Sequence, residues 1–207
     1  MKRVLFSIAL LGGCAGVGED SYRERAEAAL KAGFAGGDPK ILARVERQDE
    51  VQRLCSEHRD APPAAIAASI RSGQRAGLRY PASGRLMGDW RAGKKIAEDA
   101  GGLRYGDPAG KPAGGNCYAC HQVEEREIAY GTLGPSLLAY GKKRSGKNRS
   151  GAGVDAAVRE TYERLYNPQA FTACSAMPRF GHNGVLTPEQ IAHLVALLLD
   201  PASPVNR

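Results

Sequence analysis

The second half of this chain contains the run Cys117-Tyr118-Ala119-Cys120-His121, which limits the possible folds more than any other part of the sequence. Two thiols three positions apart can form thioethers with the two vinyl groups of a haem, and the histidine that follows can bind the iron. A fold built around this run must place a large planar group against its core. The run occurs once in the sequence, which predicts one covalently bound haem c.

Two other uses of a cysteine pair compete with this interpretation. A thioredoxin-like redox pair requires a strand–helix–strand setting, and a zinc site requires a second pair of ligands. The remaining cysteines, Cys14, Cys55 and Cys174, each stand alone, and no strand pattern surrounds the motif. Haem attachment is therefore the interpretation that the sequence favours.

An iron held by His121 has a second axial position, which needs a ligand or stays open to a small molecule. Beyond the first residue the chain has two methionines, Met87 and Met177. Met177 precedes Pro178 and lies between two predicted helices, so we predict that it is the second axial ligand. The alternative is a methionine that only fills the core. Among the histidines His182 is the competitor, because His58 falls in the N-terminal segment and His193 is expected on the polar flank of the last helix.

The N-terminus has the pattern of an export signal. Lys2 and Arg3 precede the apolar stretch Val4–Leu11, which is far shorter than the roughly 20 residues of a membrane-spanning helix. The run Leu11-Gly12-Gly13-Cys14 also resembles a bacterial lipoprotein box, which predicts acylation of Cys14 after removal of residues 1–13. Ordinary signal cleavage nearby is the alternative. Both place the mature chain in the periplasm, in the first case tethered to a membrane.

The charge of the chain limits the partners it can bind. Removing residues 1–13 takes away two basic residues and no acidic one, so the formal net charge falls from +7 to +5. This excess is too small and too dispersed to indicate nucleic acid, and it suits an acidic protein partner. Five of the basic residues cluster in a predicted loop, Lys142, Lys143, Arg144, Lys147 and Arg149. That loop is either a solvated insertion or a docking surface for an acidic protein.

The spacing of apolar residues predicts an all-α protein in two parts, an N-terminal helical extension over 14–84 and a haem domain over 85–207. Three helices fit the extension, where Ile41 and Val45 show helical spacing. In the haem domain we expect helices from Asp89 to about 100, over 154–165, and from Pro188 to a stop at Pro201. Thr187, Pro188 and Gln190 predict a capping box at the start of the last helix.

The order of helix, haem motif, Gly134-Pro135, helix, Met177 and terminal helix resembles class I cytochromes c over residues 85–204. In that family a proline after the haem motif orients the proximal histidine through its backbone carbonyl. The resemblance therefore assigns this role to Pro135 for His121. It also places Gly93 where the first and last helices of the domain cross.

Four local runs are more specific, and they resemble SoxX, a family of small monohaem cytochromes. They are Gly88-Asp89-Trp90, Gly115 to Gln122, Met177 to Gly181, and Leu199 to Asn206. The resemblance implies a heterodimer with SoxA, whose haem joins thiosulfate to a cysteine of the carrier SoxYZ in an L-cysteine S-thiosulfotransferase reaction. This chain would relay the electrons to an acceptor cytochrome c. A stand-alone electron shuttle is the alternative, and a haem sensor or peroxidase-like enzyme would require that Met177 does not bind iron.

Two cysteines remain once Cys14 is acylated and the motif holds haem. In an oxidising compartment we predict that Cys55 and Cys174 form a disulfide. Cys174 lies three residues before Met177, so this bond would pin the extension against the haem-ligand loop. The alternative is two separate thiols, with Cys55 packed as a small apolar residue and Cys174 lining the haem crevice.

Overall fold

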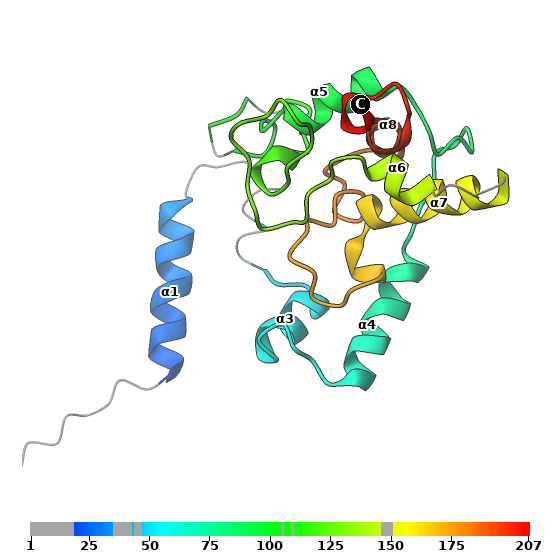
Figure 1. The fold of residues 1–207 in the computed structure, drawn as a ribbon. Helices are drawn as coiled ribbons and strands as arrows, with labels where there is room; N and C mark the ends of the chain where they lie inside the picture. Colours follow the sequence, from blue (N-terminus) through cyan, green and yellow to red (C-terminus); the bar gives the residue numbers. More distant parts are fainter. Residues whose placement is uncertain (1–18, 35–42, 44–46, 105, 109, 146–150) are drawn as a thin grey trace, which may run out of the picture. The chain divides into compact units, whose positions relative to one another are not determined.

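The computed structural model describes residues 19–34, 43, 47–104, 106–108, 110–145 and 151–207. Every regular element in these ranges is helical, which confirms the predicted all-α class (Figure 1). None of the helices in this described part is long and apolar enough to cross a membrane. The predicted signal, Cys14 and the pair Ile41 and Val45 lie outside the described residues.

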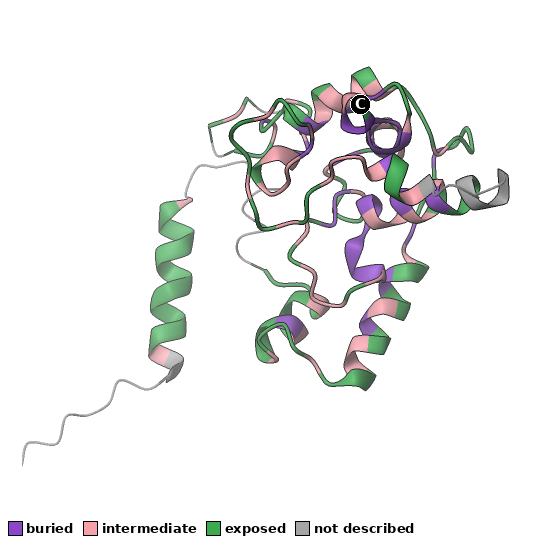
Figure 2. Ribbon diagram, viewed as in Figure 1, coloured by how far each residue is buried: buried purple, intermediate pink, exposed green. Residues whose placement is uncertain are grey.

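The chain divides into two units, Met1–Arg47 and Gln48–Arg207. In the first unit the structure describes one long helix, α1 (Glu19–Gly33), which is exposed from Tyr22 onward (Figure 2). Its side chains are mainly alanine and mixed charges, so it offers no continuous apolar face.

The core of the second unit surrounds the last helix, α8 (Pro188–Leu199), which Figure 2 shows as buried along most of its length. Thr187 caps it through the predicted capping box with Gln190, and Pro188 occupies its first turn. Its apolar residues reach the surrounding helices because they occupy nearly the whole circumference. The buried ones are Ile191, Ala192, Leu194, Val195, Ala196, Leu197, Leu198 and Leu199.

Two further helices pack on α8, namely α5 (Trp90–Glu98) and α7 (Gly151–Tyr166). At the crossing with α5, a Cβ on Gly93 would lie 2.1 Å from the backbone oxygen of His193. A side chain there would force the helices apart, so the crossing needs glycine, as the resemblance implies. His193, which we expected on the polar flank of α8, is half-buried, and its Nδ1 accepts the Asp89 N–H at 2.8 Å.

The N-terminal helices α3 (Glu50–Glu57) and α4 (Ala64–Ala76) belong to the same unit as the core. α4 packs on the short 3-10 helix η2 (Pro168–Ala170), and a buried hydrogen bond of 2.8 Å runs from Asn167 Nδ2 to Gln74 Oε1. The boundary that we predict at residue 85 falls inside this unit, which begins at Gln48.

The C-terminus is tied to helix α6 (Tyr140–Ser145) by the last 3-10 helix, η3 (Pro204–Asn206). The Asn206 carboxamide accepts the Gly141 N–H at 2.8 Å and donates to the Leu198 oxygen at 3.0 Å. The prediction of a loop over the basic cluster is wrong for Lys142, Lys143 and Arg144, which are helical in α6 because this anchoring supports a turn of helix. Lys147 and Arg149 lie outside the described residues.

Candidate haem site

The cysteine-rich motif begins on a 3-10 helix, η1 (Cys117–Ala119), which is held against the end of α5. The Gly115 N–H donates to the Ile96 oxygen at 2.7 Å, and the Asn116 N–H donates to the Asp99 oxygen at 3.0 Å. These bonds use carbonyl groups that the end of a helix leaves free. They fix the start of the motif on a packed element rather than on a loose loop.

Both thiols of the motif are free, and Cys117 and Cys120 are each half-buried. Cys117 packs against the main apolar core. Burial raises the pKa of the Cys117 thiol to about 12, so the neutral thiol is its form at neutral pH. Two unpaired thiols beside an apolar core are what thioether attachment of a haem requires.

The imidazole of His121 is held in one orientation. Its Nδ1 lies 2.8 Å from the Pro135 carbonyl oxygen, the contact that the resemblance implies. Because a carbonyl oxygen can only accept, Nδ1 carries the proton and Nε2 keeps a free lone pair. A Cβ on Gly134 would lie 2.1 Å from His121 Cε1, so the loop backbone passes directly against the ring. Nε2 is therefore the nitrogen available to bind a metal.

The loop that carries Pro135 returns alongside the motif through backbone hydrogen bonds. The Gly131 N–H donates to the Tyr118 oxygen at 2.9 Å, the Gly134 N–H to the Cys120 oxygen at 2.8 Å, and the Leu137 N–H to the Gln122 oxygen at 2.8 Å. Because these three bonds join the two segments at regular intervals, the positions of the thiols, the imidazole and Pro135 are set together.

Charged groups join the motif to α5 at its surface. Lys94 forms ion pairs with Glu124 and with Glu98, the latter at 3.2 Å, and the Tyr118 hydroxyl donates to Glu124 at 3.4 Å. Burial of its ring, followed by the charges of Glu124 and Glu98, raises the pKa of the Tyr118 phenol. Tyr118 is therefore a neutral hydrogen-bond donor over the physiological range.

Met177 lies on a separate segment but packs against the same apolar core as Cys117. Its N–H donates to Ser175 Oγ at 3.3 Å, and the side chain is half-buried. On the C-terminal side Phe180 is buried, and the Gly181 N–H donates to the Tyr166 oxygen of α7 at 3.0 Å. The core thus fixes the point at which the Met177 segment ends.

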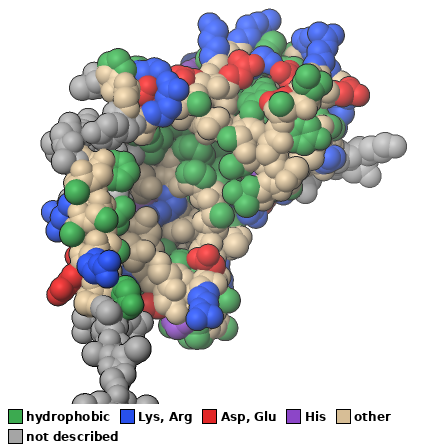
Figure 3. All heavy atoms as spheres, turned by 90° about the vertical axis from the view of Figure 1, so that its left-hand side faces the viewer, with side chains coloured by type: hydrophobic (Ala, Val, Ile, Leu, Met, Phe, Trp, Pro, Cys, Tyr) green, Lys and Arg blue, Asp and Glu red, His purple; other side chains and the backbone are tan. Residues whose placement is uncertain are grey.

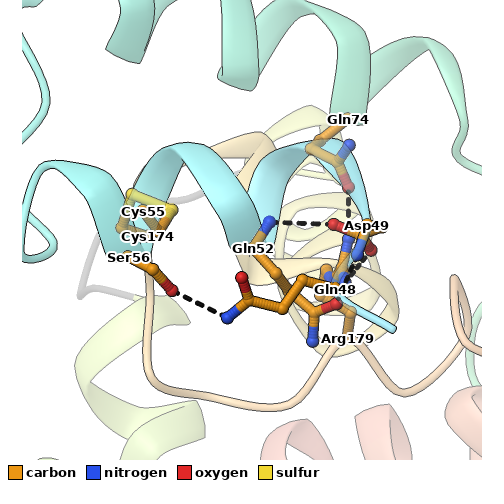
Figure 4. Close-up of a disulfide and its surroundings, with 8 residues drawn as sticks. All are labelled: Gln48, Asp49, Gln52, Cys55, Ser56, Gln74, Cys174 and Arg179. Atoms are coloured by element: carbon orange, nitrogen blue, oxygen red, sulfur yellow. Dashed lines mark hydrogen bonds and ion pairs between the residues drawn. A yellow bond between two sulfur atoms is a disulfide. The ribbon is translucent and has the colours of Figure 1, made fainter. Parts of the chain in front are cut away.

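On its N-terminal side this segment is linked to α3, as Figure 4 shows. Cys174 and Cys55 are joined in a disulfide. An open hollow of about 360 Å³ lies between α3 and the segment, and Gln52, the disulfide and Met177 are among its lining residues. This puts α3 beside the predicted iron ligand, a contact that the sequence suggested only through the number of its cysteines.

Two further links in this region were missed by the sequence analysis. Arg179 forms an ion pair with Asp49, and its guanidinium also donates to Gln74 Oε1 of α4 at 3.5 Å (Figure 4). Asp49 also caps α3 in a capping box with Gln52, and the spacing of those two residues could have shown the helix start. No local signal in the sequence relates Asp49 to Arg179, which is 130 positions away.

The other candidate ligands have different surroundings. His182 is exposed, its backbone N–H donates to the Tyr166 oxygen, and its ring lies near Gly77 at the end of α4. His58 is the C-cap of α3, and Met87 is exposed in the stretch before α5. Of the two methionine candidates, Met177 is the one that packs against the core that Cys117 also contacts.

Large apolar side chains are exposed in the loop between the motif and Pro135. Ile128 is 99% and Leu133 74% exposed. Figure 3 shows apolar side chains gathered near the centre of one face, with a band of charged side chains along its upper edge. Exposed apolar groups of this size in the loop that follows the motif are suited to contact with a large apolar group or a protein partner.

These residues fit a covalently bound haem. They supply two free thiols, an imidazole whose Nε2 is left free by its bond to Pro135, and a thioether on the same core. A helical domain that presents this set defines a haem protein of the covalently attached kind.

Comparison with known proteins agrees with this class. The profile of the cytochrome c family, described as "Cytochrome c", matches residues 91–200. The chain is also 42% identical over 171 residues to an uncharacterized lipoprotein of Aquifex aeolicus (strain VF5), a match that covers 81% of this chain and 77% of that protein. The chain belongs to the cytochrome c family, and a cytochrome c domain implies a haem c cofactor.

Proposed function

We propose that the chain is an exported cytochrome c with a single haem, and that it carries single electrons. Cys117 and Cys120 would hold the haem through thioethers, and His121 and Met177 would be its axial ligands. The observation that carries this proposal is the bond of 2.8 Å between His121 Nδ1 and the Pro135 oxygen, because it presents Nε2 to a metal in a fixed direction.

When bound, haem c supplies an iron that changes oxidation state by one electron, at a potential that histidine and methionine ligation raises. The residues of the chain hold it for this task. Pro135 and Gly134 keep the imidazole from rotating, and the hydrogen bond from Nδ1 makes Nε2 a better donor. Two ligands from different segments would close the iron to other molecules, as suits electron transfer rather than catalysis.

Ligation by Met177 is tested by Met177→Ala in the haem-loaded protein. The oxidised wild type should show the weak near-infrared charge-transfer band of sulfur ligation. The variant should lose that band, and its reduced form should bind carbon monoxide. Retention of the band in the variant would exclude Met177 as a ligand.

The finer function that we propose is that of a SoxX-like electron relay. Two observations support this role. Four local runs resemble SoxX, and the haem motif occurs once in the chain. In this role SoxA would carry the haem at which thiosulfate is joined to SoxYZ. This chain would pass the electrons to an acceptor cytochrome c.

The relay is tested by mixing this chain with SoxA, SoxYZ and thiosulfate. Reduction of the acceptor cytochrome should require all components, and this chain should be inert alone. Turnover by the isolated chain, or full turnover without it, would contradict the relay. A stand-alone electron shuttle would instead exchange electrons with the acceptor but neither copurify with SoxA nor accelerate its reaction.

We further propose that Cys14 is acylated and tethers the chain to a membrane. The lipoprotein box before it supports this, as does the similarity to a lipoprotein of Aquifex aeolicus. Cys14→Ser should move the cytochrome from the membrane fraction to the soluble periplasm. Without the lipid anchor, the small net positive charge of the chain is too weak to hold it on the membrane. A wild-type protein that is already soluble would rule out the tether.

A further inference from the structure

The segment 172–179 is linked to the rest of the unit on both sides of Met177. Three residues before it, Cys174 is bonded to Cys55 of α3. Two residues after it, Arg179 is paired with Asp49, the N-cap of α3. Among the described residues, the backbone of 172–179 makes only local hydrogen bonds. The long-range hydrogen bonds of this segment are made by the Arg179 side chain, to Asp49 at the start of α3 and to Gln74 of α4.

Arg179 lies in the interior, although its ion-pair partner Asp49 is partly exposed. Arg179 is 5% exposed, and its partner Gln74 is also buried. Gln74 Oε1 accepts from Arg179 and, at 2.8 Å, from Asn167 at the end of α7. A buried guanidinium requires partners, because an unpaired charge in the interior costs several kcal/mol. Asp49 and Gln74 therefore determine where Arg179 can lie.

These partners come from outside the region that defines the family. The cytochrome c profile matches residues 91–200, whereas α3 and α4 precede it. The helices nonetheless belong to one unit with the haem domain. The helices α3 and α4 thus contact the Met177 segment through residues that lie outside the family match.

We propose that Cys55 and Asp49 of α3 are positioning residues that hold the Met177 segment and thereby keep the methionine sulfur on the haem iron. This inference rests on the proposed ligation by Met177. The bond to Cys174 and the ion pair with Arg179 restrict the segment at both ends, so it loses little further freedom when the sulfur binds. Without them the segment would populate conformations in which the sulfur has left the iron.

Binding of imidazole to the oxidised protein measures this population. Added imidazole can bind only when Met177 has dissociated, so its apparent Kd rises as the fraction of molecules in the dissociated state falls. Met177→Ala sets the limit in which the position is always open. This readout is optical and does not depend on electron-transfer activity.

Two variants remove the two links separately. Cys55→Ser combined with Cys174→Ser removes the disulfide without leaving a thiol near the iron. Asp49→Asn removes the charge that pairs with Arg179 but keeps the cap, because asparagine and aspartate are equally good N-caps. The second variant keeps the test valid if the first does not fold. Glu50→Gln is the control, since it also neutralises a carboxylate of α3 that pairs with an arginine, here Arg53 at the exposed surface.

We expect the apparent Kd for imidazole to fall by about tenfold or more in the disulfide variant, equivalent to about 1.4 kcal/mol. It should fall by a smaller factor in Asp49→Asn, and Glu50→Gln should match the wild type. If both link variants bind imidazole like the wild type while Met177→Ala binds it more tightly, the positioning role is wrong and the ligation stands. If Met177→Ala also matches the wild type, the ligation itself is wrong. An equal effect of Glu50→Gln and Asp49→Asn would likewise overturn the role of Asp49.

Discussion

The two sides of the candidate haem site are built in different ways. The segment that carries Cys117, Cys120 and His121 is fixed by backbone hydrogen bonds to α5 and to the neighbouring loop up to Leu137. The segment around Met177 is fixed by side chains instead, through a disulfide and the ion pair of the buried Arg179 with the partly exposed Asp49. The first set of partners lies within about twenty residues of the motif, whereas the second lies more than a hundred residues away.

Because of this difference, haem attachment and ligation by Met177 should respond differently to mutation. Backbone bonds tolerate most substitutions, because every residue except proline supplies the same groups. Side-chain links depend on particular residues and can be removed one at a time. Outside the motif, the attachment side should therefore resist mutation except at Gly131 and Gly134, where a Cβ would lie within 2.1 Å of motif atoms. The Met177 side should be sensitive at a few distant positions.

The largest effect is expected on the attachment side. Replacing Cys117 and Cys120 together by alanine removes both thioethers, so the chain should carry no covalent haem at all. Haem staining after denaturing electrophoresis measures this directly. The variant with serine at Cys55 and Cys174 is the control, and it should stain like the wild type. Haem that remains on the chain without Cys117 and Cys120 would contradict the assignment of the motif.

The next largest effect concerns stability on the Met177 side. The disulfide spans 119 residues, and removing a bond of this kind costs about 2 to 5 kcal/mol of unfolding free energy. Guanidinium denaturation of the variant with serine at Cys55 and Cys174 should show a loss in this range. Ser56→Ala on the exposed side of α3 should change the free energy by less than about 0.5 kcal/mol. Equal stability of wild type and disulfide variant would mean that α3 is held by other contacts.

A pair of glycine substitutions should separate the core of the haem domain from the extension. Gly93→Ala would place a Cβ 2.1 Å from the backbone oxygen of His193, and overpacking of this kind costs about 1 to 3 kcal/mol. Gly73→Ala on α4 meets nothing within 4 Å, so better helix propensity should stabilise the protein by about 0.5 to 1 kcal/mol. Thermal unfolding of both should give shifts of opposite sign. Shifts of the same sign would contradict the packing described here.

The smallest effect that we expect is a pH dependence of the stability that Asp49 contributes. Burial alone would raise the pKa of Asp49, but the Gln52 N–H, the Arg179 guanidinium and His182 together lower it below its ordinary value of 3.8. Since the pKa is lower in the folded state, the stabilisation is present above pH 3.8 and is lost as the pH falls through the folded value. The difference in unfolding free energy between wild type and Asp49→Asn should therefore shrink below pH 3.8. A constant difference would show that the charge of Asp49 is not what matters.

The attachment side could be predicted from sequence because its chemistry is local. The motif itself contains the residues proposed to bind the haem. The helix caps at Asp89 and Thr187 follow from short sequence patterns, and the structure has both caps. The prediction of a loop at Lys142, Lys143 and Arg144 was wrong because Asn206, which is far away in sequence, supports a turn of helix there.

On the Met177 side, only the pairing of the two remaining cysteines could be predicted from the sequence. Two leftover cysteines suggested a pair, but the ion pair of Asp49 with Arg179 has no local signal. Likewise, no pattern of spacing could show that the buried Gln74 would accept hydrogen bonds from both Arg179 and Asn167. Contacts of this kind arise from the packing of α4 on η2, which becomes visible only in the fold.

The disulfide also affects how the protein responds to proteolysis. Cys55 and Cys174 lie on either side of the haem motif in sequence, so Cys117, Cys120 and His121 are inside the ring that the bond closes. A protease that cuts the chain once anywhere between Cys55 and Cys174 opens this ring but does not divide the molecule. When the cut falls between His121 and Cys174, the fragment that carries the proposed haem and the fragment that carries Met177 stay covalently joined until the bond is reduced.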